Sequence, residues 1–288
     1  MLSKQPCEIN LSINNLTIRG LQWGPQSAPP IVALHGWLDN AASFIPLAEA
    51  GLGPYRLVAL DLPGHGLSDH IGCGAVYHFV DWVSVVIRVA NALALDRFTL
   101  MGHSMGAGIA TLVAGTFPDR VHRAIFLEGL GPLTSLPEEG PENLREHIVQ
   151  GQKLDGAALK PYASKELAEQ VLMQATGIGS HSARALVHRG MVEGSEGGFY
   201  WRSDPRMRQR SAAKLTETQV LAFIKQIRSP SILIKANDGL RFDREATKKR
   251  VASLKGLEVV ELDGNHHVHM EKPVEVSSVI KEFLSRYI

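Results

Sequence analysis

The chain of 288 residues carries a formal net charge of +1 and is 44% apolar, so it can bury a large hydrophobic core. This charge gives no electrostatic basis for binding nucleic acid or an anionic membrane surface. The two cysteines, Cys7 and Cys73, are too few for a disulfide framework and too far apart for a metal-binding knuckle. The sequence shows neither a secretory leader nor an apolar run of about 18 residues, so we expect a cytoplasmic protein.

The strand pattern begins near the N-terminus. Residues 8–14 alternate between polar and apolar side chains, as in a strand that is buried on one face. Short apolar runs then recur, and each is followed by a polar or glycine-rich turn and a helical pattern. Such runs predict parallel strands that are buried on both faces and joined by helices. They lie at 31–34, 56–60, 98–101, 124–127, 231–235 and 257–262.

The pattern changes between residues 129 and 228, where strand-like runs are missing. Helical patterns occupy 141–148, 164–172 and 216–224. An excursion of about a hundred residues is too long for a loop, so we expect a helical cap inserted after a strand. The predicted organisation is a core of residues 1–128 and 229–288 with a cap of residues 129–228.

The segment Gly102-His103-Ser104-Met105-Gly106 follows one of the apolar runs and precedes a helical pattern. It matches G-x-S-x-G, a sharp turn that exposes a serine hydroxyl between a strand and a helix. The two outer glycines fit a strained turn in which the helix packs so closely against the strand that a Cβ has no room. Ser104 is therefore the candidate nucleophile.

Four segments occur in an order that resembles the α/β-hydrolase-fold family, and most closely its serine hydrolase-like group. They are 35–37 (His-Gly-Trp), 61–68, 102–106 and 264–273. The resemblance implies an α/β fold with a mostly parallel central sheet flanked by helices. It also implies a serine hydrolase that uses no cofactor and no metal.

A nucleophilic serine needs a histidine to take its proton and a carboxylate to orient that histidine. His266, His267 and His269 cluster after the last predicted strand, where the family places its catalytic histidine. In the family pattern this histidine follows a Gly-x pair and precedes a glutamate by five positions. His266 meets both conditions through Gly264 and Glu271.

The sequence leaves two candidates for the carboxylate, since both Glu128 and Asp238 lie between Ser104 and His266 in the chain. Most of the family places an aspartate after the penultimate strand, which favours Asp238. That aspartate normally stands three residues beyond the small residue ending the strand; counted from Ala236, this position is Gly239. Glu128 directly follows the predicted strand 124–127, where some family members carry their acid. We favour Glu128 and keep Asp238 as the alternative.

The resemblance also implies the oxyanion hole, while residue type and position indicate part of the pocket. The backbone N–H groups of Trp37 and Met105 would stabilise the negative charge of a tetrahedral intermediate. Trp37, His103 and Trp201 are the candidate residues of the substrate pocket, with the His103 ring facing away from Ser104.

The leading hypothesis is a hydrolase that cleaves a carboxylic ester or related acyl bond through an acyl-enzyme. Its partner would be a small acyl-containing substrate. An acyltransferase or a carbon–carbon bond hydrolase would use the same triad and is a second possibility. A non-catalytic ligand receptor on the same fold is a third, which an intact Ser104 and His266 disfavour.

Overall fold

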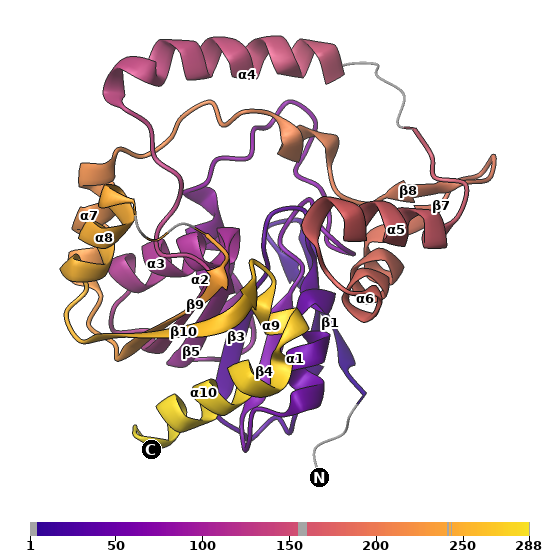
Figure 1. Ribbon diagram of the computed structural model, residues 1–288. Coiled ribbons are helices and arrows are strands. Elements are labelled where there is room, and N and C mark those ends of the chain that lie inside the picture. Colours follow the sequence, from indigo (N-terminus) through magenta and orange to yellow (C-terminus); the bar gives the residue numbers. More distant parts are fainter. Residues whose placement is uncertain (1–4, 155–159, 241, 243, 288) are drawn as a thin grey trace.

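The computed structural model describes residues 5–154, 160–240, 242 and 244–287. A single eight-stranded sheet forms its centre, with the strands in the order β1-β2-β4-β3-β5-β6-β9-β10 (Figure 1). The strands of this sheet are β1 (Cys7–Ile13), β2 (Leu16–Trp23), β3 (Pro30–Leu34), β4 (Arg56–Leu60), β5 (Phe98–His103), β6 (Val121–Leu127), β9 (Ser231–Asp238) and β10 (Leu257–Asn265). The helices are α1 (Ile45–Ala50), α2 (Asp81–Ala92), α3 (Met105–Thr116), α4 (Gly140–Leu154), α5 (Lys165–Thr176), α6 (Ser180–Gly190), α7 (Glu217–Gln226), α8 (Glu245–Ser253), α9 (Val268–Glu271) and α10 (Pro273–Ser285).

All six apolar runs of the sequence are strands, and they pair in parallel from β4 to β10. The alternating segment 8–14 lies in β1 except for Asn14, which is in the following turn. Strand β1 pairs antiparallel with β2, and β2 pairs antiparallel with β4. The sequence pattern does not predict β2, because the interior Gly20 interrupts the alternation of this strand. A Cβ at Gly20 would collide with the main chain of Ala59, so the close approach of β2 to β4 requires glycine there.

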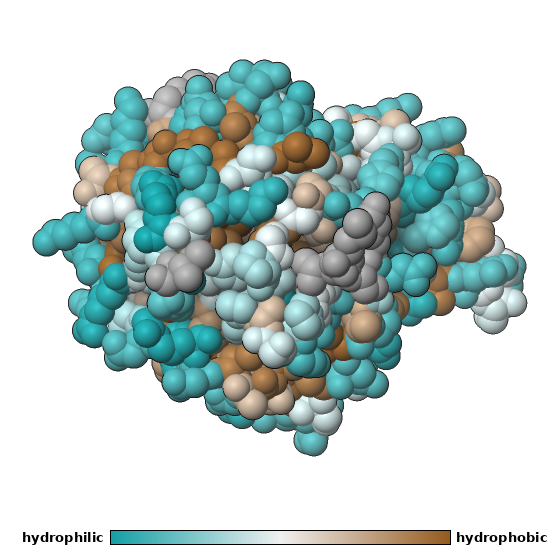
Figure 2. Space-filling model, turned by 90° about the horizontal axis from the view of Figure 1, so that it is seen from below, coloured by the Kyte–Doolittle hydropathy of each residue, from teal (hydrophilic) through white to brown (hydrophobic). Residues whose placement is uncertain are grey.

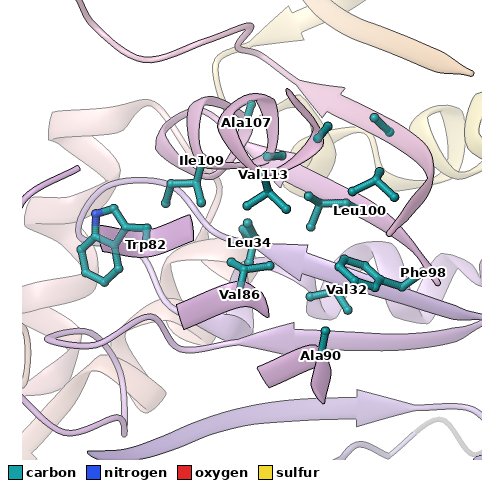
Figure 3. Close-up of a cluster of buried hydrophobic side chains, with 14 of the residues drawn as sticks. Val32, Leu34, Trp82, Val86, Ala90, Phe98, Leu100, Ala107, Ile109 and Val113 are labelled. Atoms are coloured by element: carbon teal, nitrogen blue, oxygen red, sulfur yellow. The ribbon is translucent and has the colours of Figure 1, made fainter. Parts of the chain in front are cut away.

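The strands from β3 to β6 are buried on both faces. In β3, Val32 and Leu34 belong to one hydrophobic cluster and Ile31 and Ala33 to the other, as the two-residue period of a strand requires. Figure 3 shows the first cluster, in which side chains of α2 and α3 lie against β3 and β5. The second cluster is closed by α1 and α10. The sheet is thus the middle layer of three, and the carboxyl ends of its parallel strands share one edge.

The segment expected to form a helical cap is more varied than the sequence indicated. It contains α4, α5 and α6, and also a small two-stranded sheet of β7 (Met191–Glu193) and β8 (Phe199–Trp201). Figure 1 shows α4 crossing the top of the molecule, from the side of α7 to the side of α5 and β8. By contrast, α7 lies inside the expected cap range but places Val220 and Ile224 in the cluster formed by α2 and α3. The helix therefore packs with side chains of α2 and α3, and the predicted division at residue 228 stays a prediction.

Arg189 joins α6 to β1 and to the loop after β4. Arg189 at the end of α6 donates to both carboxylate oxygens of Asp61, at 3.0 and 2.9 Å, and to Glu8 of β1 at 2.7 Å. Asp61 is fully buried and also accepts backbone N–H groups of Ala41 and Leu67. A buried carboxylate requires such partners, so this contact joins α6 firmly to the loop after β4.

The face seen in Figure 2, viewed from below relative to Figure 1, is mixed in character. Hydrophilic side chains surround several separate apolar patches. Within the part of the chain that the structure describes, no helix is both long and apolar enough to cross a membrane.

Candidate active site

Ser104 lies between β5 and α3 in a left-handed backbone conformation, with φ 51° and ψ −110°. A Cβ at Gly102 would collide with the main chain of Gly106, and one at Gly106 would collide with the main chain of Leu34. The two glycines therefore allow β5, α3 and β3 to approach closely, as the sequence predicted. A residue with positive φ in such a turn directs its side chain away from the strand, at the carboxyl edge of the sheet.

The structure brings together Ser104, His266 and Glu128. Nε2 of His266 lies 2.9 Å from Oγ of Ser104, and Nδ1 lies 3.0 Å from Oε2 of Glu128. A carboxylate only accepts hydrogen bonds, so the proton of the imidazole is on Nδ1 and Nε2 is free to accept from the serine hydroxyl. The serine, the histidine and the carboxylate are thus aligned for proton transfer away from Ser104.

Glu128 is fully buried and held by main-chain donors. Its Oε1 accepts the N–H of Ala236, and its Oε2 accepts that of Leu240, both at 2.6 Å. A Cβ at Gly239 would collide with this carboxylate, so the turn after β9 forms a close-fitting seat for it. The alternative candidate, Asp238, is exposed at the end of β9. Of the two acids that the sequence left open, the geometry places Glu128 on the histidine.

The two main-chain groups expected to bind an oxyanion lie at the same edge. Met105 is the first residue of α3, and the N–H groups in the first turn of a helix have no partner within that helix. Trp37 lies in the loop after β3, next to Leu38, whose φ is 63°. His35 in this loop accepts the N–H of Leu62 through Nε2, at 3.1 Å, and thereby fixes the loop to the one after β4.

The three residues expected to line the pocket occupy different surroundings. Trp37 is 53% exposed, and its indole N–H donates to the carbonyl of Met207 in the cap segment, at 2.9 Å. Trp201 of β8 packs in a small cluster of the cap and borders a surface hollow of about 410 Å³ beside residues 66–70. His103 is 1% exposed and lies behind the site, where its Nε2 donates to the main-chain carbonyl of His266 at 2.8 Å.

Four histidine rings gather behind the nucleophile. The ring centroid of His103 lies 4.8 Å from that of His266, 5.2 Å from that of His267 and 4.1 Å from that of His269. Burial and the neighbouring imidazoles keep the pKa of His103 well below its ordinary value. Burial is also the main cause that lowers the pKa of His269 to about 3. These two rings are therefore neutral parts of the interior.

His267 differs from its neighbours because a carboxylate accompanies it. Its Nε2 lies 3.6 Å from Oδ2 of Asp39. Burial opposes the charge on His267, but Asp39 outweighs it and raises the pKa of the imidazole. Burial likewise opposes the charge on Asp39, and His267 nevertheless holds the pKa of this carboxyl below its ordinary value. The sequence analysis assigned no role to Asp39; the only available signal was an acidic residue within a largely apolar segment.

No group of three or more histidine, cysteine, aspartate or glutamate side chains in the described ranges is placed to hold a metal ion.

A strained turn at a serine, with a histidine and a carboxylate beside it at the ends of parallel strands, is the arrangement expected of the α/β-hydrolase fold. A family model described as "alpha/beta hydrolase fold" matches residues 29–273. The chain therefore belongs to the α/β-hydrolase fold family. Among its relatives is a serine hydrolase-like protein of Danio rerio, which is 31% identical over 93% of this chain and 85% of its own length.

Further comparisons place the chain close to the serine hydrolase-like proteins. Serine hydrolase-like protein 2 of Homo sapiens is 30% identical over 96% of this chain and 93% of its own length. The crystal structure of a hypothetical protein from Pseudomonas aeruginosa superposes with a TM-score of 0.90 at 33% identity. It covers 97% of this chain and 98% of the other. These relatives support a hydrolase.

Proposed function

We propose that the protein is a serine hydrolase that cleaves a carboxylic ester or a related acyl bond through an acyl-enzyme. The observation that carries this proposal is the pair of hydrogen bonds made by His266, 2.9 Å to Ser104 and 3.0 Å to Glu128. Together they supply a nucleophile, a general base and an orienting carboxylate within hydrogen-bond distance.

In the first half of the reaction, Oγ of Ser104 attacks the acyl carbon while its proton passes to Nε2 of His266. The resulting imidazolium carries a positive charge beside the Glu128 carboxylate, which stabilises it. The N–H groups of Trp37 and Met105 donate to the oxygen that becomes negative in the tetrahedral intermediate. Collapse of this intermediate transfers the proton from His266 to the leaving alcohol or thiol and leaves the acyl group on Ser104.

In the second half, His266 takes a proton from water, which attacks the acyl carbon of the Ser104 ester. The same two N–H groups bind the second oxyanion. The proton then returns from His266 to Oγ of Ser104, the acid product leaves, and the enzyme regains its starting state. Every proton transfer therefore passes through Nε2 of His266 while Nδ1 stays bound to Glu128.

A fluorophosphonate probe tests the nucleophile directly, because it forms a stable adduct only with an activated serine. We expect one adduct on Ser104 in the folded protein and no adduct in Ser104→Ala. As a matched control, Ser84→Ala removes an exposed serine hydroxyl on α2 and should label like the wild type. A folded wild-type protein that stays unlabelled would indicate a non-catalytic receptor and overturn the proposal.

The acyl preference can be measured with p-nitrophenyl esters of increasing chain length. Turnover of these esters that disappears in Ser104→Ala is the expected result. If the probe labels Ser104 but water does not release the acyl group, an added alcohol or amine acceptor would reveal acyl transfer instead. That outcome would correct the reaction class and keep the nucleophile.

A further inference from the structure

Asp39 lies where three segments of the site meet. Its own loop follows β3, and its N–H donates to the carbonyl of Gly36 at 3.2 Å. Its Oδ2 lies 3.8 Å from Nδ1 of His103, on the nucleophile strand, and 3.6 Å from Nε2 of His267, on the loop after β10. One carboxylate thus contacts side chains next to the nucleophile and next to the base, and its loop carries the Trp37 amide.

The packing around Asp39 leaves little freedom. The Asp39 side chain is 11% exposed. A Cβ at Gly36 would lie 2.9 Å from Nδ1 of His103 and 3.0 Å from Oδ2 of Asp39, so only glycine fits between them without displacing a neighbour. The loop after β3 is therefore seated directly against the His103 ring.

His103 joins the nucleophile strand to the main chain of the base. Its Nε2 donates to the carbonyl of His266, which only accepts, so the proton of the neutral His103 ring is on Nε2. Nδ1, which faces Asp39, carries no proton. The positive partner of the buried Asp39 carboxylate is therefore His267, the residue that follows His266.

The surroundings of His267 favour its charged form through carboxylates on other elements. Burial opposes this charge most strongly, and among the carboxylates Asp39, on the loop after β3, raises the pKa of His267 the most. The titratable groups that face His267 are Asp39, Glu271, Glu128, His103, His266 and His269. Three of these are acids and three are imidazoles, so removal of the Asp39 charge leaves the cation with weaker support inside the protein.

We propose that Asp39 is a positioning residue that, with His267 as its counter-ion, holds the loop of His266 and the loop of Trp37 together beside the nucleophile strand. This role rests on the proposed function, since it concerns the alignment of the same site. The Asp39–His267 ion pair links the proposed base to the proposed oxyanion donor without touching the substrate. A displacement of about 1 Å in such an alignment can lower a rate about 10²-fold.

Asp39→Asn tests the role because it keeps the shape of the side chain and removes its charge. We expect kcat for a short p-nitrophenyl ester to fall about 10- to 100-fold while KM changes less than about twofold, since the Asp39 side chain is largely buried behind its own loop. The labelling rate of Ser104 by the fluorophosphonate should fall in parallel. Asp96→Asn, an exposed aspartate after α2, is the matched control and should leave both rates unchanged.

Two further measurements separate positioning from a general loss of structure. The NMR titration of the His267 ring should show a lower pKa in Asp39→Asn than in the wild type. His267→Gln should lower kcat to a similar extent, and the double variant should be no slower than either single variant, because both changes break the same contact. If one single variant folds poorly, thermal unfolding identifies it, and kcat of the other single variant still tests the contact without the cycle.

The outcomes distinguish this role from the proposed function. A wild-type protein that neither labels nor turns over any ester overturns the proposed function itself. An active wild type with an equally active Asp39→Asn overturns only the role of Asp39. A His267 pKa that is the same in both proteins overturns the ion pair.

Discussion

Glu128→Gln is the sharpest test of which carboxylate supports His266. Glutamine has the shape of glutamate, but its amide nitrogen donates hydrogen bonds. In the wild type Oε1 accepts one N–H, and Oε2 accepts one N–H as well as the proton of His266. Whichever way the carboxamide turns, its NH₂ group therefore faces a buried donor.

The loss of rate can be worked out from the geometry. With Nδ1 and Oε2 3.0 Å apart, the centres of the imidazolium and carboxylate charges are about 4 Å apart, and at an effective dielectric constant of about 20 they attract by about 4 kcal/mol. This attraction is present only after His266 has taken the serine proton. Since about 1.4 kcal/mol is a tenfold change in rate, its loss corresponds to about 10³-fold. The glutamine NH₂ group can also favour the imidazole tautomer with its proton on Nε2, which cannot accept the serine proton. This second effect extends the expected loss of kcat toward about 10⁴-fold.

The assay is kcat for a p-nitrophenyl ester, with folding checked by thermal unfolding. Asp238→Asn is the matched control, because Asp238 is an exposed acid at the end of β9 and should change kcat less than about twofold. If Glu128→Gln retained more than about a tenth of the activity, or if Asp238→Asn cost more, the assignment of the acid would be refuted.

Three further predictions concern the surroundings of the site. Gly239→Ala should lower kcat at least about tenfold without unfolding the protein, because its Cβ would displace the Glu128 carboxylate. An unchanged kcat would show that Glu128 can shift and still orient His266, which would contradict the close fit. Arg189→Met should lower the free energy of unfolding in urea by about 3–5 kcal/mol, because it leaves Asp61 charged and buried without its cation. The exposed Arg184→Met is its control. Burial lowers the pKa of His269 to about 3, so between about pH 4 and 6 the unfolded chain binds a proton that the folded chain does not, and stability falls as the pH falls. In this range, His269→Met should reduce the slope of the free energy of unfolding against pH by about 1.4 kcal/mol per pH unit. Urea denaturation at several pH values measures this slope, and an unchanged slope would contradict a neutral buried imidazole.

The central strands could be predicted from the sequence because they are apolar on both faces. A continuous apolar run of this kind is visible in the sequence without knowledge of the fold. Ser104 could be singled out because its glycines are required locally by the turn. The choice between Glu128 and Asp238 could not be made, since it depends on the N–H groups of Ala236 and Leu240, which the fold brings to Glu128 from more than a hundred residues away.

Other features were missed for the same physical reason. The ion pair of Asp39 and His267 joins two loops that lie far apart in the chain, and no local pattern marks it. The short strands β7 and β8 have three residues each, too few for a periodicity to be read. Helix α7 has an amphipathic pattern that fits a cap or a core equally, and only its packing on α3 distinguishes them.

The fit between Gly239 and Glu128 also limits which substitutions the chain can accept. Gly239 is the position at which the family resemblance would place an aspartate, yet any side chain there would occupy the space of the Glu128 carboxylate. A carboxylate at position 128 and a side chain at position 239 thus compete for one volume. An engineered transfer of the acid from the end of β6 to the turn after β9 would therefore need a smaller residue at position 128 together with the new side chain at position 239.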